Sequence, residues 1–136
     1  MKQLDIEAVR ENLPRVIDFI GETLDETGCG HKARFQIETA AEEVFVNIAS
    51  YAYDPDVGPA TIRIETAKDP LTVIMSFIDH GKPYDPLAKP DVKLDRPMKE
   101  RKKGGMGIFM VKKTMDDVRY AYRDGRNILT LSKNIE

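Results

Sequence analysis

Apolar residues recur three or four positions apart in three stretches of this chain, the spacing that places them on one face of a helix. We therefore predict helices over about residues 12–27, 31–53 and 105–117. Their inward stripes are Leu13, Val16, Ile17, Ile20 and Leu24 in the first helix, Ile37, Ala41, Val44, Ile48 and Ala52 in the second, and Ile108, Val111 and Met115 in the third.

Other stretches show the two-residue period of a β-strand. Ile62 and Ile64 alternate with polar neighbours, which predicts a half-exposed strand, whereas Leu71–Asp79 is apolar on both faces and predicts a central one. Asp69-Pro70 and Asp124-Gly125 are typical of hairpin turns. The predicted strands cover residues 2–7, 60–66, 71–79, 118–123 and 127–133.

Helices and strands in this order predict one domain, residues 1–136. We expect an α/β (α+β) two-layer sandwich with three main helices on one face of a mixed, mostly antiparallel sheet. The segment 81–103 holds four prolines and twelve charged residues among its 23 positions. Ordinary connections span about 4–6 residues, so a connection this long predicts a lid or a binding loop.

Composition narrows the classes of function. A net charge of −2 gives no field that favours nucleic acid or a membrane surface. The apolar runs are too short to span a bilayer, and the N-terminus shows no export signal, so we expect a cytoplasmic protein. Cys29 is the single cysteine, which excludes an internal disulfide, and neither His31 nor His80 has a partner at metal-ligand spacing.

Glu43 and Asn47 are four residues apart, so they lie on one side of the second predicted helix, at the border of its apolar stripe. A carboxylate and an amide carbonyl supply hard oxygen ligands, which suit a Mg²⁺ ion that bridges phosphates. Taken alone, the pair also fits an ordinary solvated glutamate and a boundary asparagine.

Asp79 ends the most apolar strand, so its carboxylate is expected at the rim of the core. There it can accept a hydrogen bond from the exocyclic amine of adenine, whereas guanine offers an oxygen at that position. Gly81 leaves room for a flat ring to approach. A plain strand-ending turn is the alternative reading of the same residues.

Gly104, Gly105 and Gly107 open the third predicted helix. Free amides at a helix N-terminus bind anions, and glycines let phosphates approach closely. Arg101, Lys102 and Lys103 precede them and add positive charge. The pattern is neither a Walker P-loop nor a Rossmann fingerprint, and a flexible hinge with a solvated basic run remains the alternative.

In this order the motifs resemble the GHKL superfamily of ATP-binding domains, and within it the bacterial anti-sigma factor serine/threonine kinases. The resemblance covers nearly the whole chain. It rests on Asn12-Leu13, Glu43-x-x-x-Asn47, Asp79-x-Gly81-x-Pro83-Tyr84-Asp85-Pro86, Gly104-Gly105-Met106-Gly107-Ile108 and Met115-Asp116-Asp117-Val118. It implies a Bergerat-type ATP-binding fold that uses ATP and Mg²⁺.

The resemblance also implies a role for each site residue. Glu43 is the expected general base, and Asn47 is the expected Mg²⁺ ligand. Asp79 and Gly81 are expected to bind adenine, with 81–103 as the ATP lid. The remaining expected nucleotide-binding residues are Lys103, Gly104, Gly105, Met106, Gly107 and Ile108.

The family also implies partners: a sigma factor that the kinase sequesters, a small antagonist protein that it phosphorylates, and often a second copy in a homodimer. Three residues depart from the pattern of relatives. Tyr51 replaces a frequent histidine, Lys103 replaces an arginine, and Asn127 lies near a threonine that contacts the nucleotide. The alternative function is a non-catalytic binding module, gated by ATP or ADP, that regulates a sigma factor or another partner.

Overall fold

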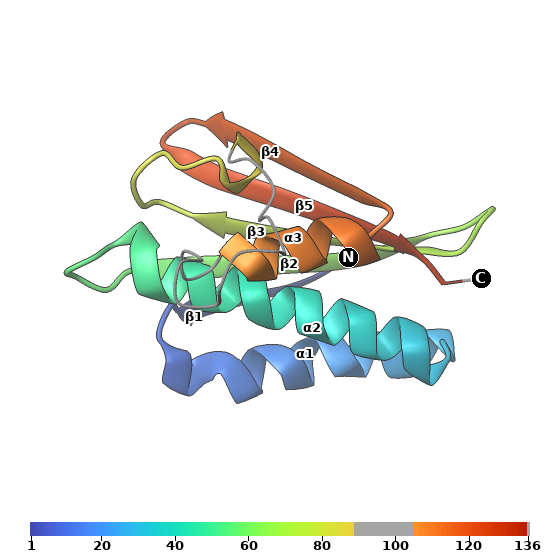
Figure 1. Ribbon diagram of the computed structural model, residues 1–136. Coiled ribbons are helices and arrows are strands. Elements are labelled where there is room, and N and C mark those ends of the chain that lie inside the picture. The colour runs from blue at the N-terminus through green and yellow to red at the C-terminus, as the bar shows by residue number, and fades with distance from the viewer. Residues whose placement is uncertain (89–104, 136) are drawn as a thin grey trace.

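The strands form one five-stranded sheet in the order β1-β2-β3-β5-β4, and all four pairings are antiparallel. A computed structural model describes residues 1–88 and 105–135 (Figure 1). β3 is central, as its two apolar faces predicted, and each hairpin turns where the sequence indicated. The strands are β1 Lys2–Glu7, β2 Pro59–Ala67, β3 Thr72–Asp79, β4 Asp117–Arg123 and β5 Arg126–Asn134.

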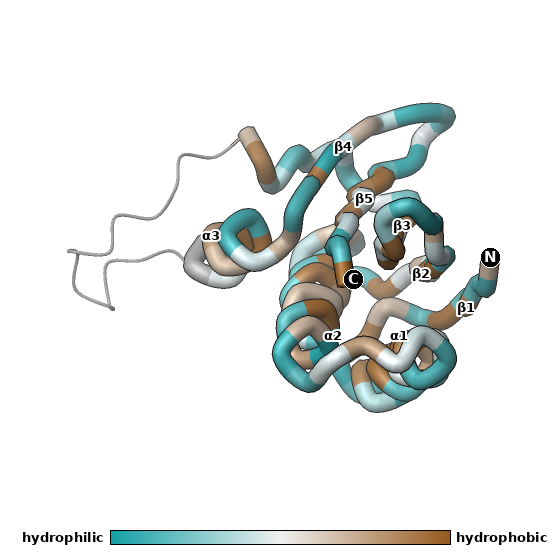
Figure 2. Tube along the Cα trace, turned by 90° about the vertical axis from the view of Figure 1, so that its right-hand side faces the viewer, coloured by the Kyte–Doolittle hydropathy of each residue, from teal (hydrophilic) through white to brown (hydrophobic). Residues whose placement is uncertain are grey.

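Three described α-helices cover one face of this sheet, which confirms the predicted two-layer sandwich. The described strands pair only antiparallel, so the sheet is not mixed as expected. Figure 2 shows all three helices on the same side of the strands. They are α1 Leu13–Thr27, α2 His31–Asn47 and α3 Gly105–Thr114. Three short turns complete the described elements: η1 Arg10–Asn12, η2 Ile48–Ala52 and η3 Pro86–Ala88.

The core lies between the helices and the covered face of the sheet. Most of the predicted inward residues of α1, α2 and α3 are buried there, and Phe45 and Phe77 are among the largest fully buried side chains. Burying one such aromatic ring contributes roughly 1.5–3 kcal/mol, so this layer dominates the stability of the fold. The sheet residues that face the helices are Ala60, Ile62, Ile64, Val73, Met75, Phe77, Leu129 and Leu131.

The second helix ends earlier than predicted. α2 stops at Asn47, and the chain continues as the π-helical turn η2 instead of as α-helix to residue 53. The spacing of apolar residues cannot reveal this change, because Ile48 is buried in the π-helical turn just as it would be in a continued α-helix. π-turns inside helices are rare and occur often at functional sites. α3 also ends early, at Thr114, because β4 begins at Asp117.

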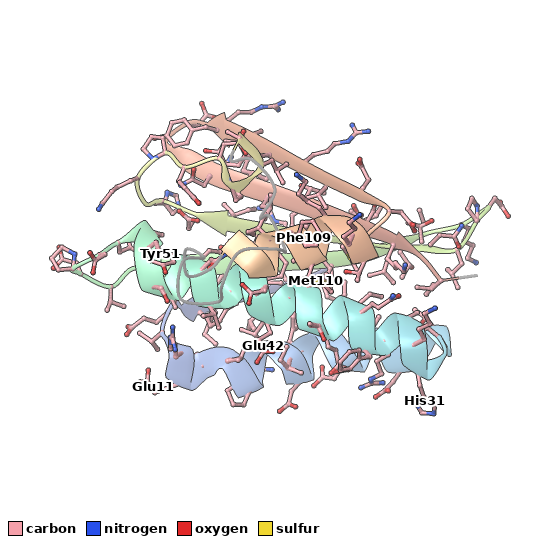
Figure 3. The ribbon with its side chains drawn as sticks, viewed as in Figure 1. Glu11, His31, Glu42, Tyr51, Phe109 and Met110 are labelled. Atoms are coloured by element: carbon pink, nitrogen blue, oxygen red, sulfur yellow. The ribbon has the colours of Figure 1, made fainter. Side chains whose placement is uncertain are left out.

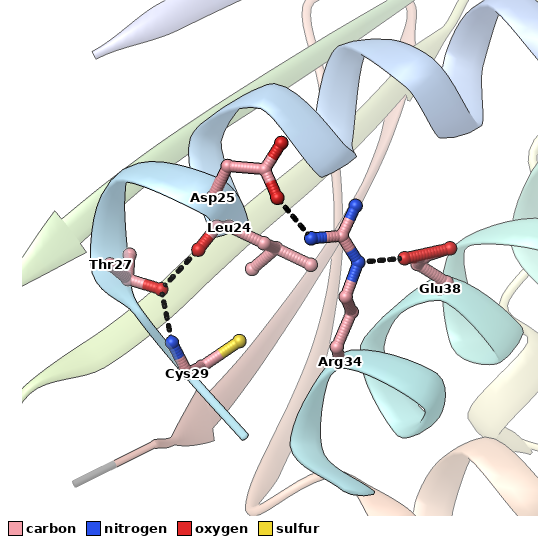
Figure 4. A network of polar contacts seen from close by, with 6 residues as sticks. All are labelled: Leu24, Asp25, Thr27, Cys29, Arg34 and Glu38. Atoms are coloured by element: carbon pink, nitrogen blue, oxygen red, sulfur yellow. Dashed lines mark hydrogen bonds and ion pairs between the residues drawn. The ribbon is translucent and has the colours of Figure 1, made fainter. Parts of the chain in front are cut away.

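A tight connection holds α1 and α2 against each other. Gly28 adopts φ 68° at the end of α1, a left-handed conformation that favours glycine. Arg34 on α2 then bridges the two helices, donating to Asp25 of α1 and to Glu38 at 2.7 Å (Figure 4). Exposed ion pairs of this kind contribute about 0–1 kcal/mol each, so they orient the helix pair more than they stabilise it.

The described residues bear on two further expectations from the sequence. Most of the predicted lid, residues 89–103, lies outside the residues that the structure describes. Within residues 1–88 and 105–135, no helix is long and apolar enough to cross a bilayer.

Candidate nucleotide-binding site

A pocket of about 210 Å³ opens where the end of α2 meets the end of β3, the start of β5 and the start of α3. Its apolar wall includes Val44, Ile48, Phe77, Ile108 and Leu129. Three tyrosines, Tyr51, Tyr84 and Tyr120, add aromatic surface. Figure 3 shows Tyr51 in the turn that follows α2. An apolar pocket with a few convergent polar groups is typical of a small-molecule site.

Asp79 supplies the buried charge of this pocket. Its side chain is 5% exposed at the end of β3. Its Oδ1 atom accepts hydrogen bonds from the Gly81 N–H at 2.8 Å and from Asn127 Nδ2 at 2.9 Å. Its Oδ2 atom has no such partner within residues 1–88 and 105–135. The carboxylate is therefore fixed in orientation and retains one acceptor for a donor on a ligand.

Gly81 lies directly against the π-turn. A Cβ at this position would lie 2.2 Å from the carbonyl oxygen of Ala52, far inside van der Waals contact. The same oxygen accepts a hydrogen bond from the Lys82 N–H at 3.1 Å. The wider π-turn thus brings the Ala52 carbonyl to the segment after β3, and only glycine fits between them.

Gly81→Ala is expected to lower the free energy of unfolding by roughly 1–3 kcal/mol, because backbone must move to accept the methyl group. Denaturant unfolding measures this loss. Gly30→Ala is the matched control, since a Cβ at Gly30 meets nothing within 4 Å and its φ is −71°. Equal stability of the two variants would contradict the close approach.

Glu43 on α2 lies against Gly107 in the first turn of α3. A Cβ on Gly107 would lie 1.9 Å from the Glu43 Cδ and 2.0 Å from its Oε2. The Glu43 carboxylate therefore occupies the space that a side chain at position 107 would need. Glu43 stands one helical turn before Asn47, and Gly107 precedes Ile108. Since Asn47 and Ile108 both line the pocket, the carboxylate is next to it. The structure thus brings together Glu43, Asn47, Asp79, Gly81, Gly107 and Ile108.

The pKa of Glu43 is raised, first by desolvation in this half-buried position and then by the nearby charge of Glu42. Ionising Glu43 therefore costs stability in the folded state. At low pH, below the pKa of an unfolded glutamate, the folded and unfolded states both carry the proton and this cost is absent. The cost grows as pH rises past the pKa of an unfolded glutamate, and it is complete once pH exceeds the raised pKa of the folded state.

Glu43→Gln is accordingly expected to raise the melting temperature at pH 7 and to leave it unchanged at pH 4. Glutamine keeps the size of the side chain and removes the ionisation. Thermal unfolding across this pH range measures the effect. A variant that is less stable than the parent at pH 7 would show that the carboxylate is a stabilising group.

Several expected site residues fall at or beyond the edge of the described structure. Lys103 and Gly104 lie outside it. Gly105 and Met106 form the first two residues of α3, which confirms that the glycines open a helix. Their contact with phosphate remains a prediction.

Two further polar residues, Asn127 and Tyr120, line the pocket, and Tyr53 lies close to it on the loop before β2. The sequence had indicated only Asn127, as a departure from the pattern of relatives. Asn127, 7% exposed on β5, is paired with Asp79 across the sheet and hydrogen-bonds to it. Tyr120 donates to the Asn127 Oδ1 from β4. Tyr53 accepts the His80 N–H at 2.8 Å and donates to the Pro59 carbonyl, which ties the residue after β3 to the first residue of β2. The polar Asn127 in an otherwise apolar strand was the available signal.

The residues present fit an adenine nucleotide. A fixed buried carboxylate suits an exocyclic amine, and Gly81 donates its N–H to that carboxylate while packing against the Ala52 carbonyl. No cluster of three His, Cys, Asp or Glu side chains able to hold a metal occurs among the described residues. A single amide ligand at Asn47 is consistent with Mg²⁺, which keeps several waters and binds mainly through substrate phosphates.

This fold and pocket define a nucleotide-binding α/β domain of the ATPase type. The family model described as histidine kinase-like ATPase domain matches residues 6–133, and the chain belongs to that family. The membership confirms the resemblance found in the sequence and indicates ATP as the nucleotide.

Two relatives refine the likeness. The chain is 31% identical over 103 residues to the serine/threonine-protein kinase BtrW of Bordetella bronchiseptica, covering 76% of this chain and 72% of BtrW. It also matches the crystal structure of the RsbU and RsbW domains of Rv1364c from Mycobacterium tuberculosis, with a TM-score of 0.69 and 22% identity. That match covers 99% of this chain and 33% of the longer one, and it supports the fold alone.

Proposed function

We propose that this protein is an ATP-dependent serine/threonine kinase that phosphorylates a small antagonist protein and that, once freed from this antagonist, sequesters a sigma factor. The proposal rests on the arrangement of Glu43 beside Gly107, one turn from Asn47 in the pocket that holds Asp79. The likeness to BtrW, named a serine/threonine-protein kinase, supports the reaction class. The motif resemblance to anti-sigma factor kinases supports the partners.

Phosphoryl transfer needs positioning and charge stabilisation more than covalent chemistry from the protein. ATP supplies the γ-phosphoryl group, and ADP is the product. In this proposal Glu43 takes the proton of the substrate hydroxyl as its oxygen bonds to phosphorus. The raised pKa of Glu43 suits that role, because a base closer to neutral pH accepts a proton more readily. In the same proposal Asp79 holds the adenine ring, and the start of α3 faces the phosphates.

Asn47 is proposed to bind Mg²⁺ through its side-chain carbonyl. Asn47→Ala is expected to weaken ATP binding measured with Mg²⁺ by about tenfold, because the variant lacks the side-chain oxygen proposed to bind the metal. Titration calorimetry with and without Mg²⁺ measures this. Binding of ATP without Mg²⁺ serves as the internal control, and an equal loss in both conditions would contradict metal binding by Asn47.

The reaction is tested with proteins encoded by neighbouring reading frames. The purified chain, ATP, Mg²⁺ and each candidate antagonist are combined, and phosphoserine or phosphothreonine is measured by mass spectrometry. Incorporation at one site that requires this chain supports the kinase. ATP-dependent binding of a sigma factor with no phosphorylation of any candidate would instead support the non-catalytic binding module.

A further inference from the structure

The amide of Asn127 forms the centre of a polar network that the proposed reaction does not use. We propose that Asn127 is a positioning residue that aims Asp79 at the 6-amino group of adenine and joins the base site to the backbone of residues 82–84. The inference rests on the proposed nucleotide site and adds the origin of its base selectivity.

The Asn127 Nδ2 atom has three acceptors around it. It donates to the Asp79 Oδ1 at 2.9 Å and to the Lys82 carbonyl at 2.8 Å, with the Gly81 carbonyl at 3.4 Å. One amide group therefore links the end of β3 to the segment that leaves it. Because Asn127 is buried on β5, this link runs through the sheet rather than through solvent.

The Asn127 Oδ1 atom has two donors. It accepts the Tyr84 N–H at 3.1 Å and the Tyr120 hydroxyl. Burial raises the pKa of Tyr120, so its hydroxyl stays protonated and remains a donor at neutral pH. A flipped amide would put its NH₂ against two donors and its oxygen against three acceptors, so the orientation of Asn127 is determined by its partners.

This orientation leaves Asn127 without hydrogen-bonding capacity for a ligand, so it acts through Asp79. The carboxylate is held at Oδ1 by Asn127 and by the Gly81 N–H, and Oδ2 remains to accept from a base. Adenine presents an amine at C6 and guanine an oxygen. Guanine also carries donors at N1 and N2. A fixed carboxylate aimed at C6 rejects guanine, whereas a carboxylate free to turn can reach those donors.

The same amide shapes the wall of the pocket. Lys82, Pro83 and Tyr84 all line it, and Asn127 bonds to the first and last of them. Loss of the amide should therefore loosen this wall in the nucleotide-free protein as well. That consequence gives a measurement that does not depend on catalysis.

The test compares ATP and GTP affinities of the full chain by titration calorimetry in the parent and in Asn127→Ala. We expect ATP affinity to fall by about tenfold or more, as for loss of a hydrogen bond to a charged group, and GTP affinity to fall less. The ratio of ATP affinity to GTP affinity should therefore decrease. Partial unfolding would lower both affinities by one factor and leave their ratio unchanged.

Asn12→Ala is the matched control, because the Asn12 side chain also donates to a backbone carbonyl, that of Glu7 at 2.9 Å, away from the pocket. It should leave the ATP-to-GTP ratio unchanged. If Asn127→Ala does not fold, Tyr120→Phe removes one donor from the network and keeps the ring, and it should narrow the ratio in the same direction. A second readout is amide exchange of Tyr84 without nucleotide, which should be faster in either variant.

The outcomes separate the two proposals. A parent that binds neither nucleotide overturns the proposed function, whatever the variants do. A parent that binds ATP, with variants that keep both the ATP-to-GTP ratio and the Tyr84 exchange rate, overturns the role of Asn127 alone. A narrowed ratio together with faster Tyr84 exchange supports it.

Discussion

Glu43→Gln is expected to lower phosphoryl transfer to the antagonist by about 10²–10⁴-fold, the usual contribution of a positioned general base. Glutamine fits the same space beside Gly107 but cannot take a proton. Nucleotide affinity should remain nearly unchanged, because Asp79, Asn47 and the start of α3 are intact. Single-turnover transfer and ATP titration, measured on the same preparation, separate the two effects.

Glu42→Gln is the matched control for this change. Glu42 is the adjacent carboxylate, exposed on the outer side of α2 (Figure 3). Its replacement removes one negative charge at nearly the same place and should leave the transfer rate within a small factor of the parent. Transfer by Glu43→Gln at the parent rate would mean that Glu43 is not the base. Equal losses in both variants would assign the effect to local charge.

Asp79→Asn is expected to weaken ATP binding by about 10- to 150-fold, the loss of a charge-assisted hydrogen bond of roughly 1.5–3 kcal/mol. The structure also predicts how the amide of the variant is oriented. Because the Gly81 N–H and Asn127 Nδ2 both donate to the inner oxygen, the new amide should keep its oxygen there. Its NH₂ then takes the outer position and meets the adenine amine donor to donor.

The same orientation presents a donor to the C6 oxygen of guanine, so Asp79→Asn should also raise GTP affinity relative to ATP. Titration with both nucleotides measures the preference. Asp18→Asn, which changes an exposed carboxylate on α1, should alter neither affinity. Equal ATP and GTP affinities in the parent would already contradict the assignment of Asp79 to adenine.

Local sequence patterns determined the elements of this fold. Helical spacing around Ile20 and Val44 and alternation around Ile62 located helices and strands, since burial on one face requires those periods. The two-sided apolarity of Leu71–Asp79 predicted the central place of β3. The motifs at Glu43 and Asp79 also indicated the site, because residue type and order along the chain already restrict the chemistry.

Contacts between distant segments were decided only by the tertiary structure. The π-turn after Asn47 places the Ala52 carbonyl against Gly81, a packing that no local period encodes. Asn127 meets Asp79 because β5 pairs with β3 in one register, and the two residues are 48 positions apart in sequence. Glu43 approaches Gly107 only when α3 packs on α2. Such contacts depend on relative orientation and register, and these are fixed by the packing of the whole core.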